Sequence, residues 1–363
     1  MALELRGTVV LGDERETDRA WVLGDRITLE RPAHVDHVIE GVVLPGLVDV
    51  HCHVGLAADG PVDRPTARAQ ALVDRDSGVL LVRDAGSPSD TAWVHDDADL
   101  PRLLRAGHHL ARPKRYLRHY GRELDSPDEL AGAMAQEAAR GDGWVKIVAD
   151  WIDRDLGADG DLRPLWTDTQ LAQGMAAAHA AGARVTAHAF STEALPGLLA
   201  AGIDCIEHGT GLTPELIDEV ARRGIPVTPT LLQISQFDQI AAQGEAKFPL
   251  FAARMRHLYE RRYTQVREMF DAGVRLLVGT DAGGTIEHGQ IAAECAELVR
   301  AGVPAREVVA AASWRTREYL GFASIAEGAP ADVVVYGTDP REDVRALGAP
   351  SAVVLRGAVH TRA

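Results

Sequence analysis

Two histidines separated by one residue stand near the end of an apolar run, His51 and His53 within Val48–Val54. Because side chains of a strand alternate between its two faces, histidines two residues apart point the same way. Neutral imidazole is the commonest metal ligand in proteins. The same pair is also compatible with two surface histidines, so it needs support from elsewhere in the chain. Cys52, between them, is expected to face the opposite side and to pack in the core.

Single ionisable residues recur inside or at the ends of later apolar runs. These are Lys146 within Trp144–Ala149, His188 ending Val185–His188, His208 ending Cys205–His208, and Asp281 ending Leu276–Asp281. Each one alone could be a hydrogen-bonded polar group of the core. If the runs are parallel strands of a barrel, however, their carboxyl ends converge on one cavity. Burying so many ionisable groups together without a metal would cost much free energy, so the pattern predicts a metal site.

The elements that would position these residues alternate regularly. Apolar, β-branched runs follow a helical segment and a glycine at Arg184–His188, Ile203–His208, Ile225–Thr230 and Val274–Asp281, and further runs lie at Val42–Val54, Val79–Val82, Trp144–Ala149 and, more weakly, His108–Leu110. Glycine is the residue that most often follows the last turn of a helix. About eight strands alternating with helices predict an α/β fold, a (β/α)8 TIM barrel. A doubly wound sheet is the alternative, but no glycine-rich phosphate loop follows any strand.

The two ends of the chain differ from its middle. A chain of 363 residues exceeds the roughly 250 of a TIM barrel. Short strands and turn signals such as Gly24-Asp25 and Arg356-Gly357 mark both flanks. A closed barrel places its first and last strands side by side. We therefore expect residues 1–45 and 323–363 to form one small β-sandwich and residues 46–322 to form the barrel.

Composition excludes several partners and locations. The net charge of −15, without a basic stripe, argues against nucleic acid and against an anionic membrane, and leaves a small-molecule substrate as the expected partner. Because no secretory signal or membrane-spanning run is seen, we expect a cytoplasmic protein. Cys52, Cys205 and Cys295 have no metal-type spacing and are expected to be buried thiols. The oligomeric state stays open, a homo-oligomer included.

Several segments together resemble the amidohydrolase superfamily, in particular the binuclear branch that includes prolidase-like and imidazolonepropionase-like enzymes. They are Pro45–His53, Val82–Gly86, Val145–Ile147, Val185–His188, Ile206–Thr210, Gly279–Gly283 and Gly328–Val335. Their combination covers nearly the whole chain. The resemblance implies a TIM barrel that holds two divalent cations.

The resemblance also implies a role for each expected metal ligand. His51, His53 and Asp281 would hold the more buried cation, and His188 and His208 the more exposed one. Lys146, carboxylated on its amine, would bridge the two. Zinc suits histidine and carboxylate ligands that leave a position open. Glu207 belongs to the family pattern but is expected to point away from the cavity, as a structural residue.

The expected reaction is hydrolysis of an amide-type C–N bond in a dipeptide, an N-acyl amino acid or a cyclic amide. A hydroxide bridging the two cations would attack, with Asp281 as general base and then general acid. Lactone or phosphotriester hydrolysis could use the same metal pair, whereas a deaminase and a non-catalytic barrel homologue fit the sequence less well.

Loops that follow the strands are expected to contact the substrate. The residues expected to do so are His119, Tyr120, Asp153 and Gln233. Arg83 is a further choice, but it could instead pair with Asp84 or with a neighbouring strand.

Overall fold

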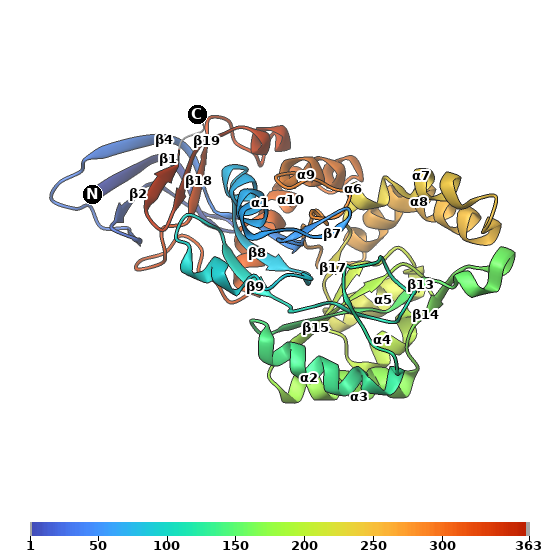
Figure 1. The fold of residues 1–363 in the computed structure, drawn as a ribbon. Helices are drawn as coiled ribbons and strands as arrows, with labels where there is room; N and C mark the ends of the chain where they lie inside the picture. Colours follow the sequence, from blue (N-terminus) through green and yellow to red (C-terminus); the bar gives the residue numbers. More distant parts are fainter. Residues whose placement is uncertain (1, 361–363) are drawn as a thin grey trace.

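The computed structural model describes residues 2–360 and has a mixed α/β fold. Strands from the two ends of the chain lie together at one end of the molecule, and parallel strands with their helices make up the rest (Figure 1).

The two ends of the chain join in one seven-stranded sheet of order β20-β19-β18-β4-β1-β2-β3. β1 pairs with β4 in parallel, and the other neighbours pair antiparallel. The strands are β1 (Ala2–Gly12), β2 (Arg15–Leu23), β3 (Arg26–Thr28), β4 (His37–Pro45), β18 (Val333–Tyr336), β19 (Pro350–Leu355) and β20 (Ala358–His360).

This terminal sheet encloses its own apolar core, which includes Leu5, Val22 and Val335. The backbone N–H of Ile27 donates to Ala329 O at 2.8 Å, so the edge strand β3 also touches the segment that leads into β18. The sheet therefore bends around its core. The flanks meet as the sequence predicted, but within residues 2–360 their strands form one sheet, so the predicted β-sandwich is not confirmed. The division at residues 45 and 323 stays a prediction.

Parallel strands form two further sheets. A three-stranded sheet has the order β5-β8-β9, and a six-stranded sheet has the order β11-β10-β12-β15-β16-β17. Their strands are β5 (Leu47–Cys52), β8 (Val79–Asp84), β9 (Arg102–Arg105), β10 (Leu110–Ala111), β11 (Arg122–Glu123), β12 (Trp144–Val148), β15 (Arg184–Ala189), β16 (Cys205–His208) and β17 (Val227–Thr228). Two small hairpins pair β6 (Leu56–Ala57) with β7 (Gly60–Pro61), and β13 (Asp150–Ile152) with β14 (Leu162–Pro164).

Residues 275–282 connect the two parallel sheets without forming a regular strand. Leu277 N donates to Val227 O at 2.9 Å, and Val50 N donates to Val278 O at 3.0 Å. The prediction of a regular strand at Val274–Asp281 was therefore wrong, because this segment makes isolated bridges and Asp281 adopts a positive φ of 59°. Within residues 2–360 the parallel strands do not form one closed barrel of eight regular strands.

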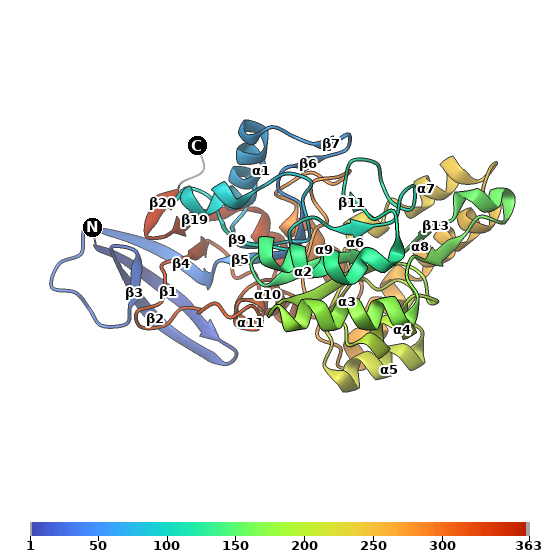
Figure 2. The same cartoon turned by 60° about the horizontal axis from the view of Figure 1, so that its bottom comes forward.

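Helices lie around the parallel strands, with α2, α3, α4 and α5 along one side of the six-stranded sheet (Figure 2). The helices are α1 (Arg64–Asp76), α2 (Leu130–Arg140), α3 (Asp168–Ala180), α4 (Leu195–Ala201), α5 (Pro214–Arg223), α6 (Leu231–Ile234), α7 (Phe237–Gly244), α8 (Pro249–Asp271), α9 (Ile291–Arg300), α10 (Ala305–Ala312) and α11 (Trp314–Tyr319). Short 3-10 turns are η1 (Ala92–Asp96), η2 (Pro127–Glu129), η3 (Arg154–Asp159) and η4 (Val344–Gly348). None of the helices in the described part is long and apolar enough to cross a bilayer.

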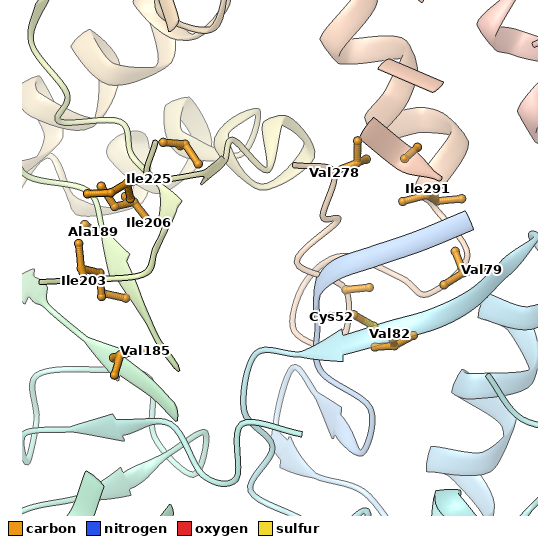
Figure 3. Packing of buried hydrophobic residues seen from close by; sticks show 14 of the residues in the cluster. Cys52, Val79, Val82, Val185, Ala189, Ile203, Ile206, Ile225, Val278 and Ile291 are labelled. Carbon is orange, nitrogen blue, oxygen red and sulfur yellow. The ribbon is translucent and has the colours of Figure 1, made fainter. Parts of the chain in front are cut away.

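The largest apolar core lies between the parallel strands and these helices. Figure 3 shows Val185, Ala189 and Ile206 of β15 and β16 gathered on one side of it, and Cys52 and Val82 of β5 and β8 on another. Cys52 packs in this largest core, as expected from strand alternation. All three cysteines are buried and form no disulfide.

A buried carboxylate ties the terminal sheet to the parallel strands. Asp332 accepts from Arg102 Nε at 2.5 Å, and its Oδ2 lies 3.5 Å from Arg317 Nη2. Arg356 N also donates to Asp332, at 3.0 Å. The Arg317 side chain is only 2% exposed, so without Asp332 its guanidinium would be a buried charge far from water.

Asp332→Ala should therefore lower the free energy of unfolding by about 3–5 kcal/mol, the range for breaking a buried ion pair. Urea denaturation followed by circular dichroism measures the change. Asp18→Ala is the control, because Asp18 is exposed and its Oδ2 lies 3.6 Å from Arg19 Nε; it should change stability by less than about 0.5 kcal/mol. Equal effects of the two substitutions would contradict this account of the junction.

Candidate active site

All six residues predicted as metal ligands come together at the carboxyl ends of the parallel strands. Asp281 Oδ1 lies 3.1 Å from both His51 Nε2 and His53 Nε2, and Lys146 Nζ lies 3.4 Å from His51 Nε2. The His208 ring is 5.0 Å from that of His51 and 4.7 Å from that of His188, measured between centroids. One largely buried cluster thus forms from residues in or directly after β5, β12, β15 and β16 and from the segment after β17.

Three of the histidines have their second ring nitrogen held by a neighbour. His51 Nδ1 contacts Glu207 Oε2 at 2.8 Å, His53 Nδ1 contacts Gly86 O at 2.6 Å, and His208 Nδ1 contacts Thr230 Oγ1 at 2.7 Å. Bonds of this kind orient a ligating histidine and set its tautomer, which leaves Nε2 free to face a cation.

His188 presents an unpaired nitrogen to the same space. Its Nε2 is buried and has no hydrogen-bond partner among residues 2–360; the carboxylate of Asp150 is 3.7 Å away. That carboxylate is itself bound by Phe190 N and by Ser191 N and Oγ. An unsatisfied buried donor or acceptor is costly, and a cation at this nitrogen would remove the cost.

The protonation states of the cluster suit a cation. Burial lowers the pKa of His53 and lowers the pKa values of His188 and His208 well below the usual range, which keeps these rings neutral. Burial also lowers the pKa of the Lys146 amine. Burial opposes ionisation of Asp281, but His51 and His53 outweigh it and hold the pKa of this carboxyl well below its usual value.

His51 behaves differently from the other three histidines. Burial and the Lys146 amine act to lower its pKa, but the carboxylates of Asp281 and Glu207 outweigh them and raise it. A cation close to Asp281 would take the place of that proton.

Glu207 faces the interior beneath the cluster, so the expectation that it points away from the cavity was wrong. Its carboxylate accepts hydrogen bonds from Arg83 Nη2, Thr186 Oγ1 and His51 Nδ1. Strand alternation fails here because His208 adopts a positive φ of 66°, so both neighbours face inward. Arg83 is fully buried and donates to Val50 O of the neighbouring strand β5 at 2.7 Å, as the second interpretation of the sequence allowed, but its ionic partner is Glu207 and not Asp84.

The segment that carries Asp281 lies directly against β5. A Cβ added to Gly279 would lie 2.6 Å from His51 Cβ, and one added to Gly283 would lie 2.4 Å from His53 O. Asp49 fixes the contact, since it accepts from Thr280 N at 3.1 Å and from Thr280 Oγ1 at 2.6 Å. The absence of a side chain at these two glycines is what lets Asp281 reach both histidines.

A pocket of about 660 Å³ opens from the cluster. Aromatic side chains form a wall that starts at His188, whose ring centroid is 4.1 Å from that of Phe190, 5.4 Å from that of Trp151 and 5.7 Å from that of Tyr116. Four glutamines of the α6–α7 region also line the pocket: Gln233, Gln236, Gln239 and Gln243. The Tyr116 hydroxyl stays protonated because burial raises its pKa. Apart from the cluster itself, the surface around a bound molecule is thus mostly neutral.

Two of the four predicted substrate contacts line this pocket, and two do not. Tyr120 and Gln233 line it. His119 is exposed on the loop before β11, and Asp153 binds Arg115 at 3.1 Å beside a separate pocket.

Phe190, Trp151 and Tyr116 were not among the predicted contacts. Phe190 had a signal, because it stands two residues after His188 and so projects to the same face. Tyr116 had none, since it lies in a loop without a periodic pattern.

Comparisons with known proteins show the family and the fold of this chain. A model of the amidohydrolase family matches residues 42–359. An uncharacterized protein of Mycobacterium tuberculosis is 50% identical over 357 residues, which cover 98% of this chain and 95% of that protein. In structure, the chain is similar to a Xaa-Pro dipeptidase with bound methionine in its active site (TM-score 0.84, 22% identity, all of both chains). It is also similar to the A. niger ochratoxinase (TM-score 0.81, 20% identity, 99% of this chain and 95% of that one). Because the family match spans most of the sequence, the chain belongs to the amidohydrolase family.

Proposed function

We propose that this protein is a hydrolase that uses two divalent cations to cleave an amide-type C–N bond, in a dipeptide, an N-acyl amino acid or a cyclic amide. The observation that carries the proposal is the convergence of six donor side chains, all buried except the partly exposed Asp281, beside a pocket of about 660 Å³. Membership of the amidohydrolase family supports hydrolysis, since this family usually binds divalent metals.

The proposed ligands divide into two groups. His51, His53 and Asp281 would hold one cation, and their donor atoms already lie within 4.8 Å of one another. His188 and His208 would hold the second, with carboxylated Lys146 between the two. The neutral imidazoles and the unpaired His188 Nε2 fit such a group. When bound, the cations would lower the pKa of a water molecule and polarise a substrate carbonyl.

Asp281 is the proposed proton carrier. Its carboxylate is ionised, because His51 and His53 keep its pKa low, and it reaches the pocket with a side chain that is 17% exposed. A carboxylate in this position can take a proton from the attacking water and pass it to the leaving nitrogen.

The pocket wall is proposed to hold the substrate. Tyr120 and Gln233 remain proposed contacts, and Phe190 and Trp151 join them because they line the pocket next to His188. For His119 and Asp153 a substrate contact stays a prediction.

Activity of the metal-loaded protein against dipeptides, N-acyl amino acids, lactams, lactones and phosphotriesters tests the function. Turnover of amides above that of the lactones and phosphotriesters supports the proposal. Turnover confined to esters or phosphotriesters would contradict it.

Protein purified without chelators should carry about two divalent ions per chain, with zinc as the preferred metal, because histidine and carboxylate ligands with open positions suit it. Elemental analysis by mass spectrometry measures the content. A content well below one ion per chain, also after incubation with zinc, would rule the metal pair out.

Asp281→Asn should lower turnover by about 10²- to 10⁴-fold while the fold is retained, because the amide cannot carry the proton. Steady-state kinetics and thermal unfolding are the measurements. Asp218→Asn on the exposed face of α5 is the control and should keep full turnover. If the Asp281 variant kept near wild-type turnover, another group would have to move the proton.

Lys146→Ala should lose the metal pair, and a small carboxylic acid added to this variant should restore part of it. The chain has lysine at only three positions, Lys114, Lys146 and Lys247, so a generic buried cation would be expected to be arginine. Burial lowers the pKa of the Lys146 amine, and a neutral amine can add carbon dioxide to form a carbamate.

Metal content is the readout for both variants of this position. Lys146→Arg keeps the charge but should not restore the metals, whereas the control Lys247→Ala should keep them. An arginine variant with two ions and full turnover would refute the bridging role.

A further inference from the structure

A second pocket, of about 600 Å³, lies beside the active-site pocket and has the opposite character. Its lining includes five cationic side chains and two carboxylates, Asp153 and Asp155, and therefore has a net charge of +3. We call it the basic pocket; its cations are Arg112, Lys114, Arg115, Arg118 and Arg154. Such a concentration is unexpected in a chain whose net charge is −15.

Most of these cations have no acidic partner. Arg115 pairs with Asp153 at 3.1 Å and donates to Trp151 O and Arg163 O at 3.2 Å. The other four cations make no ion pair within the part of the chain that the structure describes. Elsewhere acidic residues are used to neutralise arginines; Arg254, for example, contacts both Asp161 and Glu193.

Part of the basic pocket is also unsatisfied in its hydrogen bonds. Arg112 Nη1 and Arg115 Nε are buried and lack a partner among the described residues. The nearby Gln170 carries no charge, and its amide is already used, since it donates to Asp128 Oδ1 and accepts from Thr167 N, both at 3.0 Å. Guanidinium groups that keep free donors match carboxylate and phosphate oxygens in geometry and charge.

The two pockets share part of their lining. Tyr116 and Arg154 line both of them. Among residues 2–360, Arg154 is the sole arginine or lysine that lines the active-site pocket, and it is exposed. A molecule that crosses from one pocket to the other would therefore meet neutral aromatic and amide groups near the cluster and cationic groups farther out.

We propose that the basic pocket binds an anionic group, a carboxylate or a phosphate, at the end of the substrate remote from the bond that is cleaved. The substrate is then amphiphilic, with an uncharged part against the wall of Phe190 and Trp151 and an anionic end between the loop at residues 112–118 and η3. This inference rests on the proposed function for the identity of the reactive bond, but the anion site itself is independent of it. The local positive charge also counteracts the repulsion that a chain of net charge −15 exerts on an anionic substrate.

Kinetics on a matched set of amides tests the proposal. The amides share one reactive group and differ at the far end, which is a carboxylate, a phosphate monoester or an uncharged methyl ester. The metal-loaded wild-type protein should show a KM roughly tenfold lower for at least one anionic amide than for the ester. Comparison of the carboxylate with the phosphate identifies the preferred anion. The difference should shrink as salt is added, since exposed charges are screened.

The double variant Lys114→Gln/Arg118→Gln removes two exposed cations without a described ion-pair partner. It should raise the KM of the anionic amide toward that of the ester and leave kcat unchanged. Arg15→Gln, an exposed arginine of the terminal sheet, is the matched control and should change neither. Equal KM values for all three ends in the wild-type protein, or no effect of the double variant, would overturn the proposal.

Calorimetry with inorganic phosphate and with glutarate gives a readout that needs no turnover. Both probes are titrated into metal-loaded wild-type, double-variant and control proteins. Any binding of a probe to the metal ions is therefore common to all three proteins. Weaker binding by the double variant alone supports the anion site, even if no amide is hydrolysed and the proposed function fails. Equal binding by all three proteins, with amide hydrolysis intact, would reject the anion site and leave the proposed function standing.

Discussion

Six ionisable side chains share one desolvated space at the carboxyl ends of the parallel strands, and the rest of the site is arranged around the cost of burying them. Burial alone opposes the charged form of each of them. Asp281 stays ionised because it lies 3.1 Å from two imidazoles. His53, His188 and His208 stay neutral because nothing near them outweighs burial. The result is three neutral imidazoles near one carboxylate, and a divalent cation close to Asp281 would take the place of the proton on His51, whose pKa Asp281 and Glu207 raise.

A surrounding layer of buried polar groups keeps this cluster in place. Glu207 binds His51 on one side and Arg83 and Thr186 on the other, so it couples the first histidine to β8 and β15. Asp49 ties β5 to the segment of Asp281 through Thr280, and burial raises the pKa of this carboxyl to about 7. Since groups of this layer orient ligands and set tautomers, their loss should change metal affinity even though none of them would touch a metal.

Much of this could be predicted from the sequence, and the failures have local causes. The ligand positions could be read because each is an ionisable residue inside or at the end of an apolar run, and strand ends meet in a parallel sheet. The direction of Glu207 could not, because a positive φ at His208 breaks the alternation of faces. The irregular course of residues 275–282 could not either, since only the tertiary contact of Gly279 and Gly283 with β5 explains it. Side chains of the aromatic wall come partly from a loop, where sequence periodicity carries no information. Four cations of the basic pocket lie close together at residues 112–118, but the sequence does not show that this loop folds against Arg154 to line one pocket.

The account depends on two cations that are held by these six side chains. Anomalous diffraction from crystals of zinc-loaded protein, recorded on both sides of the zinc absorption edge, locates the metals directly. The account predicts two peaks per chain about 3.5–4 Å apart, one bounded by His51, His53 and Asp281 and one by His188 and His208, with density for a carbamate on Lys146 between them. A single peak elsewhere, or two peaks with a bare Lys146 amine, would contradict it.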